Sequence, residues 1–226
     1  VRRAGSICTS SNAPLIVKRY LDEARPVFFS RGFNLGANTA RQLGDDLSRV
    51  FKVRRDGSLT GPLEGSGDPA RALMFIWDGH CAVHTRFKAA DIAAARASMP
   101  GVTVVVHPEC DPELVALADV SGSTEAILKA IAGAPAGSSI AVGTEANFVL
   151  RMAADYPDRV VKPLRTSFCA NMARIDLEAL ARVLASIEAH ERGEGPLLFP
   201  LSVDEGLKRD AAASLERMIA IVEGRP

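Results

Sequence analysis

The stretch VTVVVHPEC, residues 102–110, runs from a series of β-branched residues directly into a histidine, a glutamate and a cysteine. Valine and threonine favour strands, and a short apolar run of this kind is typical of a strand buried in a parallel sheet. The same order of strand and polar loop occurs in LMFIWDGHCAVH (73–84) and in SIAVGTEANF (139–148). Ligands bind beyond the carboxyl ends of parallel strands, so these three loops are candidate parts of one site.

Strand-like runs alternate with alanine-rich stretches along most of the chain, which is typical of βα units and a largely parallel sheet. We expect strands at 27–30, 73–77, 102–106, 139–143 and 159–163. Apolar residues three and four apart predict helices at 13–24, 35–51, 87–98, 111–118, 124–133, 145–155, 175–190 and 203–224. The segment 52–72 contains four glycines and two prolines and predicts a surface insertion or flexible loop. The fold class is therefore α/β.

The composition favours a globular enzyme over several other classes of protein. With 226 residues, of which 47% are apolar and 24% charged, the chain can bury a large core without disulfide cross-links. Basic and acidic residues number 27 each, which leaves no basic surface to attract nucleic acid. The sequence has no run of the about 18 apolar residues that a membrane span requires. We expect a cytoplasmic protein that acts on small molecules, without nucleic-acid or membrane partners.

The cysteines stand one to a segment, at positions 8, 81, 110 and 169. This spacing differs from the dense framework of a disulfide-stapled domain and suggests single ligands that converge from distant loops. Cys81 with His84 and His107 with Cys110 could supply the four ligands of a structural zinc site. Three thiolates from separate loops would instead suit an iron–sulfur cluster with one open iron. Both metal sites are open at this point, and a lone buried cysteine can also be simply a small apolar residue.

Hydroxyl-rich segments precede two of the expected helices. TSSN (9–12) leads into the first, and Gly122, Ser123 and Thr124 lead into the helix at 124–133. Free backbone N–H groups and hydroxyls at a helix start can hold a carboxylate or a phosphate. Ordinary N-capping by serine or threonine is the simpler interpretation of each segment.

Seven short motifs resemble, in this order, those of quinolinate synthase, the NadA-type enzyme of NAD biosynthesis. They are CTSSNA (8–13), NLG (34–36), WDGHCAVH (77–84), VHPEC (106–110), ADVSGST (118–124), GTE (143–145) and CANM (169–172). The resemblance implies three similar α/β/α domains of three layers with parallel sheets, arranged with pseudo-threefold symmetry around a central site. It also implies a reaction that condenses iminoaspartate with dihydroxyacetone phosphate to quinolinate, with release of water and inorganic phosphate.

A [4Fe–4S] cluster held by three cysteines is the Lewis acid that the resemblance implies. Carried over position by position, Cys81 and Cys169 match two of its ligands, whereas Cys8 and Cys110 match positions that are not ligands. By the same resemblance, we expect the third ligand in an N-terminal domain that would precede residues 8–13. We therefore expect the chain alone to be catalytically inactive. The resemblance further implies a functional link to L-aspartate oxidase or aspartate dehydrogenase as the source of the imine.

Proton transfers in such a reaction require an acid and a base close together. The resemblance assigns work to the histidine and glutamate of HPEC, and we expect Glu109 to be the acid–base residue while His107 and His84 orient the substrate. The hydroxyls that match substrate-facing positions of the family are those of Ser10, Ser123 and Thr124.

The resemblance also suggests how the chain divides. Residues 1–80 would form a partial second α/β domain with an insertion at 52–72, and residues 81–168 a third α/β domain. Residues 169–226 would form a C-terminal helical segment that packs back on the missing first domain.

Arg31, in SRGFNLG (30–36), stands near a position where the family tends to be acidic. The alternative to an enzyme of this family is a zinc-stabilised or cluster-free α/β module that binds small anions.

Overall fold

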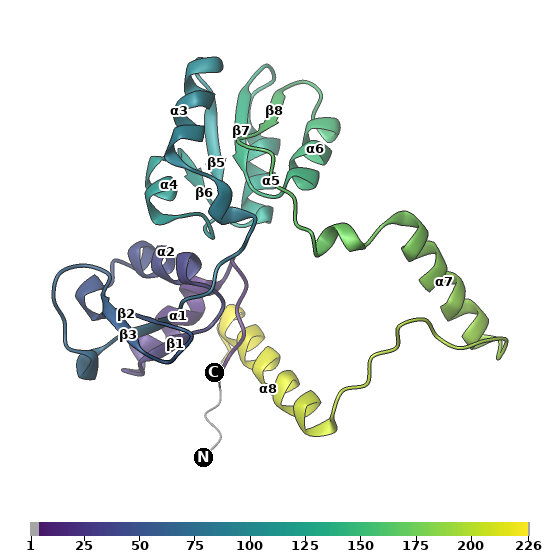
Figure 1. Cartoon of the computed structure of the whole chain (residues 1–226), viewed down its shortest axis with the longest axis horizontal. Coiled ribbons are helices and arrows are strands. Elements are labelled where there is room, and N and C mark those ends of the chain that lie inside the picture. The colour runs from purple at the N-terminus through teal and green to yellow at the C-terminus, as the bar shows by residue number, and fades with distance from the viewer. Residues whose placement is uncertain (1–4, 226) are drawn as a thin grey trace.

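The computed structural model describes residues 5–225, which form two α/β units and two further helices (Figure 1). Each unit is built around a sheet of four strands. Within the described residues, no helix is both long and apolar enough to cross a membrane. The α/β class with largely parallel sheets is confirmed, and each of the five expected strands exists.

The first unit contains α1 (Ala13–Asp22), β1 (Val27–Phe29), α2 (Phe33–Leu43), β2 (Val50–Val53), β3 (Leu59–Pro62) and β4 (Met74–Trp77). The strand order is β1-β4-β2-β3, in which β1 and β2 run parallel to β4 and β3 runs antiparallel to β2. Helices α1 and α2 pack on one face of this sheet through an apolar cluster that includes Val17, Leu35, Met74 and Ile76.

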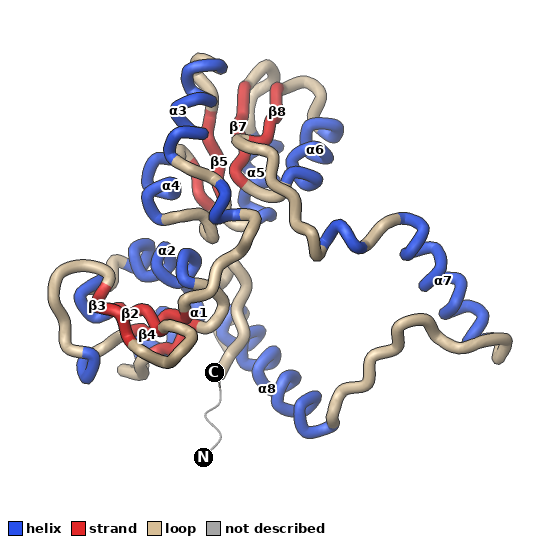
Figure 2. The backbone as a smooth tube through the Cα atoms, viewed as in Figure 1, coloured by secondary structure: helices blue, strands red, loops and turns tan. Residues whose placement is uncertain are grey.

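The second unit contains α3 (Ala89–Ser98), β5 (Thr103–Val106), α4 (Pro112–Leu117), β6 (Val120–Ser121), α5 (Thr124–Gly133), β7 (Ser139–Gly143), α6 (Ala146–Asp155) and β8 (Val160–Pro163). All its strands are parallel, in the order β6-β5-β7-β8. Val104 and Val106 face the apolar cluster that includes α3 and α4, and Val105 faces the cluster that includes α5 and α6. Helices therefore cover both faces, which gives three layers (Figure 2).

Two segments of the first unit differ from the sequence-based expectation. The helix expected over 35–51 ends at Leu43, because Gly44 takes a left-handed conformation with φ of 72° and residues 50–53 then form β2. The segment 52–72 is not wholly a loop, since β3 pairs with β2 to form a hairpin. The strand β3 was not predicted because it is short, has few apolar residues and contains a glycine and a proline.

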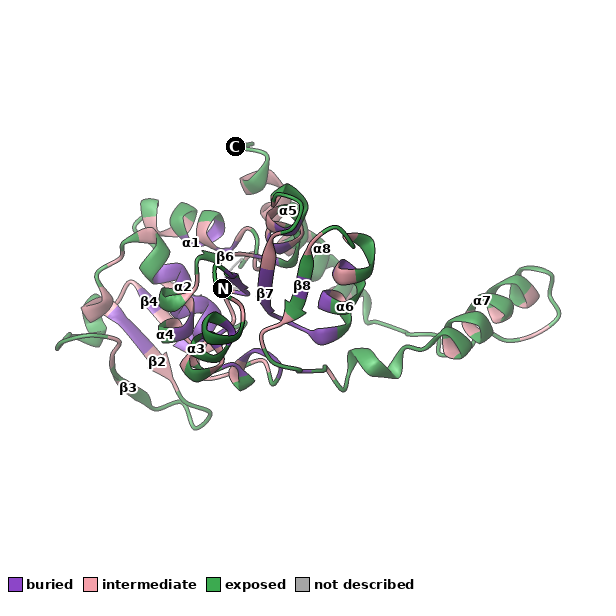
Figure 3. Ribbon diagram, turned by 90° about the horizontal axis from the view of Figure 1, so that it is seen from above, coloured by how far each residue is buried: buried purple, intermediate pink, exposed green. Residues whose placement is uncertain are grey.

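The two C-terminal helices are α7 (Leu177–Glu191) and α8 (Glu205–Val222). Helix α7 projects away from both units, and all of its residues are exposed or only partly buried (Figure 3). Helix α8 lies beside α1, and Ser214 and Arg217 donate hydrogen bonds to the carbonyl of Gly5. Exposed apolar residues remain along this region, among them Leu177, Leu184, Phe199, Leu201 and Leu207. The expected domain boundaries stay predictions, and their ends at 1–4 and 226 lie outside the described residues.

Gly36 sets how closely α2 approaches the sheet. A Cβ atom at this position would lie 2.7 Å from Ile76 Cγ2 and 3.0 Å from Phe29 Cδ1. We predict that Gly36→Ala lowers the free energy of unfolding by about 1–3 kcal/mol, because the added methyl overpacks the core despite alanine's better helix propensity. Urea unfolding followed by circular dichroism measures the change.

Gly133→Ala is the matched control, since Gly133 also belongs to a helix but a Cβ atom there would have nothing within 4 Å of it. This control should be neutral or slightly stabilising. Equal free energies of unfolding for the two variants would show that the close approach of α2 does not matter.

Candidate active site

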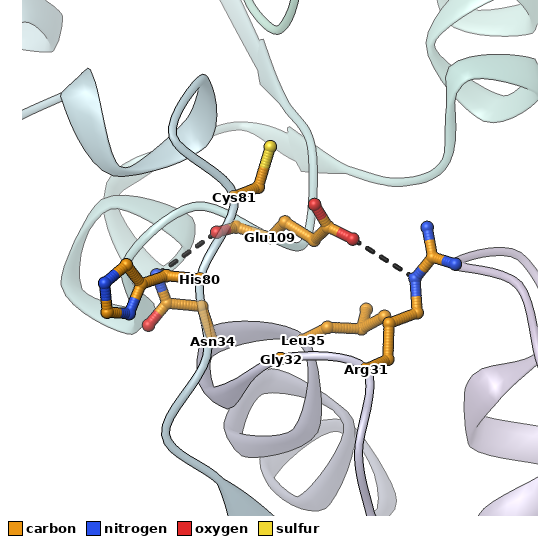
Figure 4. A pocket seen from close by; sticks show the side chains of 7 residues that line it. All are labelled: Arg31, Gly32, Asn34, Leu35, His80, Cys81 and Glu109. Carbon is orange, nitrogen blue, oxygen red and sulfur yellow. Dashed lines mark hydrogen bonds and ion pairs between the residues drawn. The ribbon is translucent and has the colours of Figure 1, made fainter. Parts of the chain in front are cut away.

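The candidate site lies where the carboxyl ends of strands from both units meet. Cys81 and His84 follow β4, and His107 and Glu109 follow β5. Cys169 comes after β8. The order of parallel strand, loop and helix start places all these loops at the same edge of each sheet. Figure 4 shows part of the site, in which Cys81 and Glu109 line a cavity of about 220 Å³ together with Arg31.

Two asparagines of α2 fix the loop that carries Glu109. Asn34 Nδ2 donates to the carbonyl of Glu109 at 3.1 Å and to Asp111 Oδ1 at 2.9 Å. Asn38 Nδ2 donates to the carbonyls of Pro108 and Cys110 at 2.8 and 2.9 Å. Residues four apart share one face of a helix, so a single face of α2 holds three successive peptide groups of the second unit.

The Glu109 carboxylate is held from two sides. Arg31 Nε donates to Oε1 at 3.2 Å, and His84 Nδ1 lies 3.2 Å from Oε2. The hydrogen bond with His84 is the main reason that the pKa of Glu109 lies well below its usual range, with the charges of His84 and Arg31 acting in the same direction against burial. Glu109 is therefore a carboxylate in the resting site.

His84 is buried and makes contacts at both ring nitrogens. Its Nε2 lies 3.1 Å from Thr144 Oγ1, at the end of β7. Burial by itself would lower the pKa of His84, but hydrogen bonds with Cys81 and Glu109 outweigh it and raise this pKa to about 9. The resting site thus pairs an imidazolium with a carboxylate.

His107 stacks on His84, with ring centroids 4.3 Å apart and ring planes 14° from parallel. Burial and the neighbouring charge of His84 lower the pKa of His107. Its Nδ1 accepts from the backbone N–H of Glu109, and its Nε2 lies 3.2 Å from Ser10 Oγ. His107 is therefore neutral. Its hydrogen bond with Ser10, one of the expected substrate-binding residues, connects that serine to the pair of histidines.

Cys81 belongs to a group that could hold a metal ion. One ligand atom from each of Cys81, His84 and Glu109 lies within 4.8 Å of the other two. The hydrogen bond with His84 lowers the pKa of Cys81 despite partial burial, which favours the thiolate that metals bind.

Cys169 lies outside this group but in a neighbouring segment. Ser167 Oγ donates to the carbonyl of Val83 at 3.0 Å, which ties the segment of Cys169 to that of Cys81. The backbone N–H of Cys169 donates to Glu145 Oε1 at 3.3 Å. Both cysteines are half-buried against the same apolar cluster of the second unit. The two expected thiol ligands are therefore on adjacent segments.

The structure does not bring together the four residues of the CxxH and HxxC zinc site. Cys110 is fully buried in the core, its Sγ contacts the carbonyl of Gly143 at 3.7 Å, and burial raises its pKa to about 12. His107 turns towards Ser10 instead. That zinc-site interpretation is wrong for the described residues, because the strand β5 that precedes His107 and Cys110 draws the thiol into the apolar core. Cys8 is half-buried, and burial raises the pKa of its thiol.

The three expected hydroxyl residues differ in their surroundings. Ser10 and Ser123 line a second cavity of about 650 Å³ between the units. Ser123 also caps α5, since its Oγ accepts from the backbone N–H of Ala126, so the simpler capping interpretation holds for its present contact. Thr124 is exposed at the first position of α5.

Several residues that organise the site received no role from the sequence. Asn34, Asn38, Thr144 and Glu145 hold the loops, and Arg31 was noted only as a departure from the family. Thr144 and Glu145 lie in the loop after the strand expected at 139–143, which was already a candidate part of the site, although neither residue had a role of its own. Nothing in the sequence placed Asn38, which stands in the middle of a helix.

Comparisons with known proteins point to one family. The family described as "Quinolinate synthetase A protein" matches residues 2–220. A quinolinate synthase of Streptomyces coelicolor is 40% identical, over 97% of this chain and 55% of the relative. The quinolinate synthases of Corynebacterium glutamicum and Bacillus licheniformis are 38% and 37% identical, over 98% and 97% of this chain and 55% and 58% of their own length. The chain thus spans little more than half the length of these relatives.

We predict that Glu109→Gln lowers the pKa of the His84 ring from about 9 towards 6.5, because the variant removes a carboxylate that stabilises the imidazolium. Between these two pH values the ring should be protonated in the wild type and increasingly neutral in the variant. Titration of the imidazole resonances by nuclear magnetic resonance measures this.

Glu64→Gln is the control, because Glu64 is exposed and pairs with Arg41 away from the site. The control should leave the His84 titration unchanged. An unchanged titration in Glu109→Gln would mean that the carboxylate does not set the charge of His84.

Proposed function

The chain belongs to the quinolinate synthetase A family, and from this premise we propose that it forms the part of a quinolinate synthase that carries two of three cluster cysteines. The protein would condense iminoaspartate with dihydroxyacetone phosphate to quinolinate in NAD biosynthesis, releasing water and inorganic phosphate. The observation that carries this proposal is the meeting of Cys81, His84, His107 and Glu109 beside the segment of Cys169.

The residues fit a [4Fe–4S] cluster. Cys81 is half-buried with a lowered thiol pKa, and Cys169 lies on the adjacent segment against the same apolar cluster. We assign these two as ligands, and the third thiolate to an N-terminal domain. When bound, such a cluster supplies an open iron that polarises a carboxylate or hydroxyl oxygen.

The protein's own residues would move protons and hold the substrate. Glu109, a carboxylate hydrogen-bonded to protonated His84, is suited to take a proton from carbon or oxygen, while His84 can return one. Nδ1 of His107 accepts from the backbone N–H of Glu109, so the neutral ring carries its proton on Nε2 and can donate a hydrogen bond from there to orient the substrate. Ser10 and Ser123 line a cavity large enough for a small dicarboxylate and would bind its oxygens, with Thr124 beside them at the helix start.

The surroundings of the reaction belong to the same proposal. We propose that the protein is cytoplasmic. We also propose that L-aspartate oxidase or aspartate dehydrogenase supplies its imine substrate. The exposed apolar residues of α7 and α8 would pack on the first domain, and the three domains would share pseudo-threefold symmetry. The chain by itself would be inactive.

A second candidate function is a cluster-free module that binds small anions. The cavity lined by Ser10 and Ser123 favours it, because hydroxyls at this cavity need no metal to bind a carboxylate. This module would bind quinolinate in calorimetry with metal-free chain, and would be unaffected by the loss of Cys81 or Cys169.

We predict that the chain, fused behind the N-terminal domain of the Streptomyces coelicolor relative and purified without oxygen, is brown and contains iron and acid-labile sulfide. Cys81→Ser and Cys169→Ser should each abolish the cluster, because each removes a thiolate ligand, and quinolinate formation should stop with it. Iron and sulfide assays and mass spectrometry of the product make the measurement.

Cys8→Ser is the matched control, since Cys8 is half-buried like the two proposed ligands but is assigned no iron. The control should keep both the cluster and the activity. A fusion that holds no iron, or clusters that survive the loss of Cys81 and Cys169, would contradict the proposal.

A further inference from the structure

The side chains of Cys81, His84 and Glu109 form a donor set of a kind that zinc uses. They offer a thiolate, an imidazole and a carboxylate whose ligand atoms lie within 4.8 Å of one another. In a tetrahedral zinc site, with bonds of about 2.0–2.3 Å, neighbouring ligand atoms are about 3.3–3.8 Å apart. The pair His84 Nδ1 and Glu109 Oε2 is already at 3.2 Å. Only a contraction of about an ångström at the thiol is needed to reach this geometry.

Two of the three ligands already have partners on the side away from the group. His84 Nε2 meets Thr144 Oγ1 at 3.1 Å, which leaves Nδ1 to face Cys81 and Glu109. Arg31 Nε holds Glu109 Oε1 at 3.2 Å, so the other oxygen, Oε2, is the one that faces His84 Nδ1 and the position a metal would take. Such outer hydrogen bonds orient ligands in metal sites and raise their affinity. The orientation that a metal would require is therefore present before it binds.

The group also has an open side. Cys81 and Glu109 line the cavity of about 220 Å³ that Arg31 and His80 border (Figure 4). Three protein ligands and one accessible position are the arrangement of zinc sites that bind water or a substrate oxygen. The thiolate and the carboxylate together carry two negative charges, which would balance the two positive charges of one zinc ion.

We propose that Cys81, His84 and Glu109 bind a single zinc ion, with the fourth position open to the cavity beside Arg31. The site requires neither Cys169 nor a cysteine from another domain, so the chain forms it alone. It differs from the four-ligand CxxH and HxxC site, because His107 and Cys110 take no part in it. Zinc and the cluster would compete for Cys81, since one thiolate cannot serve both in this geometry.

The test is a titration of the metal-free, reduced chain with zinc chloride in a calorimeter, and with cobalt chloride followed by thiolate-to-cobalt absorption. We expect one equivalent to bind in the wild type. Cys81→Ser should remove the cobalt band and the zinc heat, whereas Cys169→Ser should leave both unchanged. Circular dichroism confirms that each variant is folded.

Thr144 provides a second variant that keeps the three ligands. Thr144→Val should weaken zinc binding by about tenfold, because His84 loses its outer partner, and Thr144→Ser should restore it. Equal losses in Cys81→Ser and Cys169→Ser, or full binding by Cys81→Ser, would overturn the proposal. Since the cluster needs both cysteines and zinc only Cys81, failure of the zinc site and failure of the cluster are distinguishable.

Discussion

The side-chain amides of Asn34 and Asn38 hold together the parts of the molecule on which the site depends. Their four hydrogen bonds reach three backbone carbonyls and one carboxylate in residues 108–111 of the other unit. Buried carbonyl groups without partners are costly, so this loop is stable in its present course only while α2 lies against it. Gly36, between the two asparagines, brings α2 close to the sheet and thus sets the position of both amides.

With this loop fixed in place, the carboxylate of Glu109 helps to determine the protonation states of the two histidines of the site. Glu109 has Arg31 on one oxygen and His84 on the other, and its negative charge favours the protonated form of His84. The charge on His84 in turn helps to keep the stacked His107 neutral. Two histidines only 4.3 Å apart therefore hold different protonation states, which suits His84 to donate a proton and His107 to donate a hydrogen bond from Nε2.

The sequence predicts the second unit better than the first, for physical reasons. Strands β5 and β7 are apolar runs buried between helices, so their composition reveals them, whereas β3 (Leu59–Pro62) lies half-exposed at a sheet edge and has a glycine and a proline. The loops after β4 and β5 were recognised as candidates because each follows a buried parallel strand, although the two strands belong to different sheets whose packing the sequence does not reveal. The partners across the interface, Arg31 and Asn38, could not be found, since their roles depend on how two units pack.

The segments of the two cysteines share a local structure but differ in the side chain three residues after the cysteine. In CAVH and in CANM a 3₁₀ turn begins three residues after the cysteine, at His84 and at Met172. His84 is buried and reaches Glu109 and Thr144, while Met172 is exposed and has no polar group to offer as acid or base. Cys81 therefore has a paired histidine and glutamate beside it, whereas the carboxylate near Cys169, that of Glu145, accepts hydrogen bonds from the backbone N–H groups of Phe148 and Cys169. The segment of Cys169 keeps the thiol and the turn but not the histidine, which is the expected division if one cysteine is only a ligand and the other also adjoins the reacting groups.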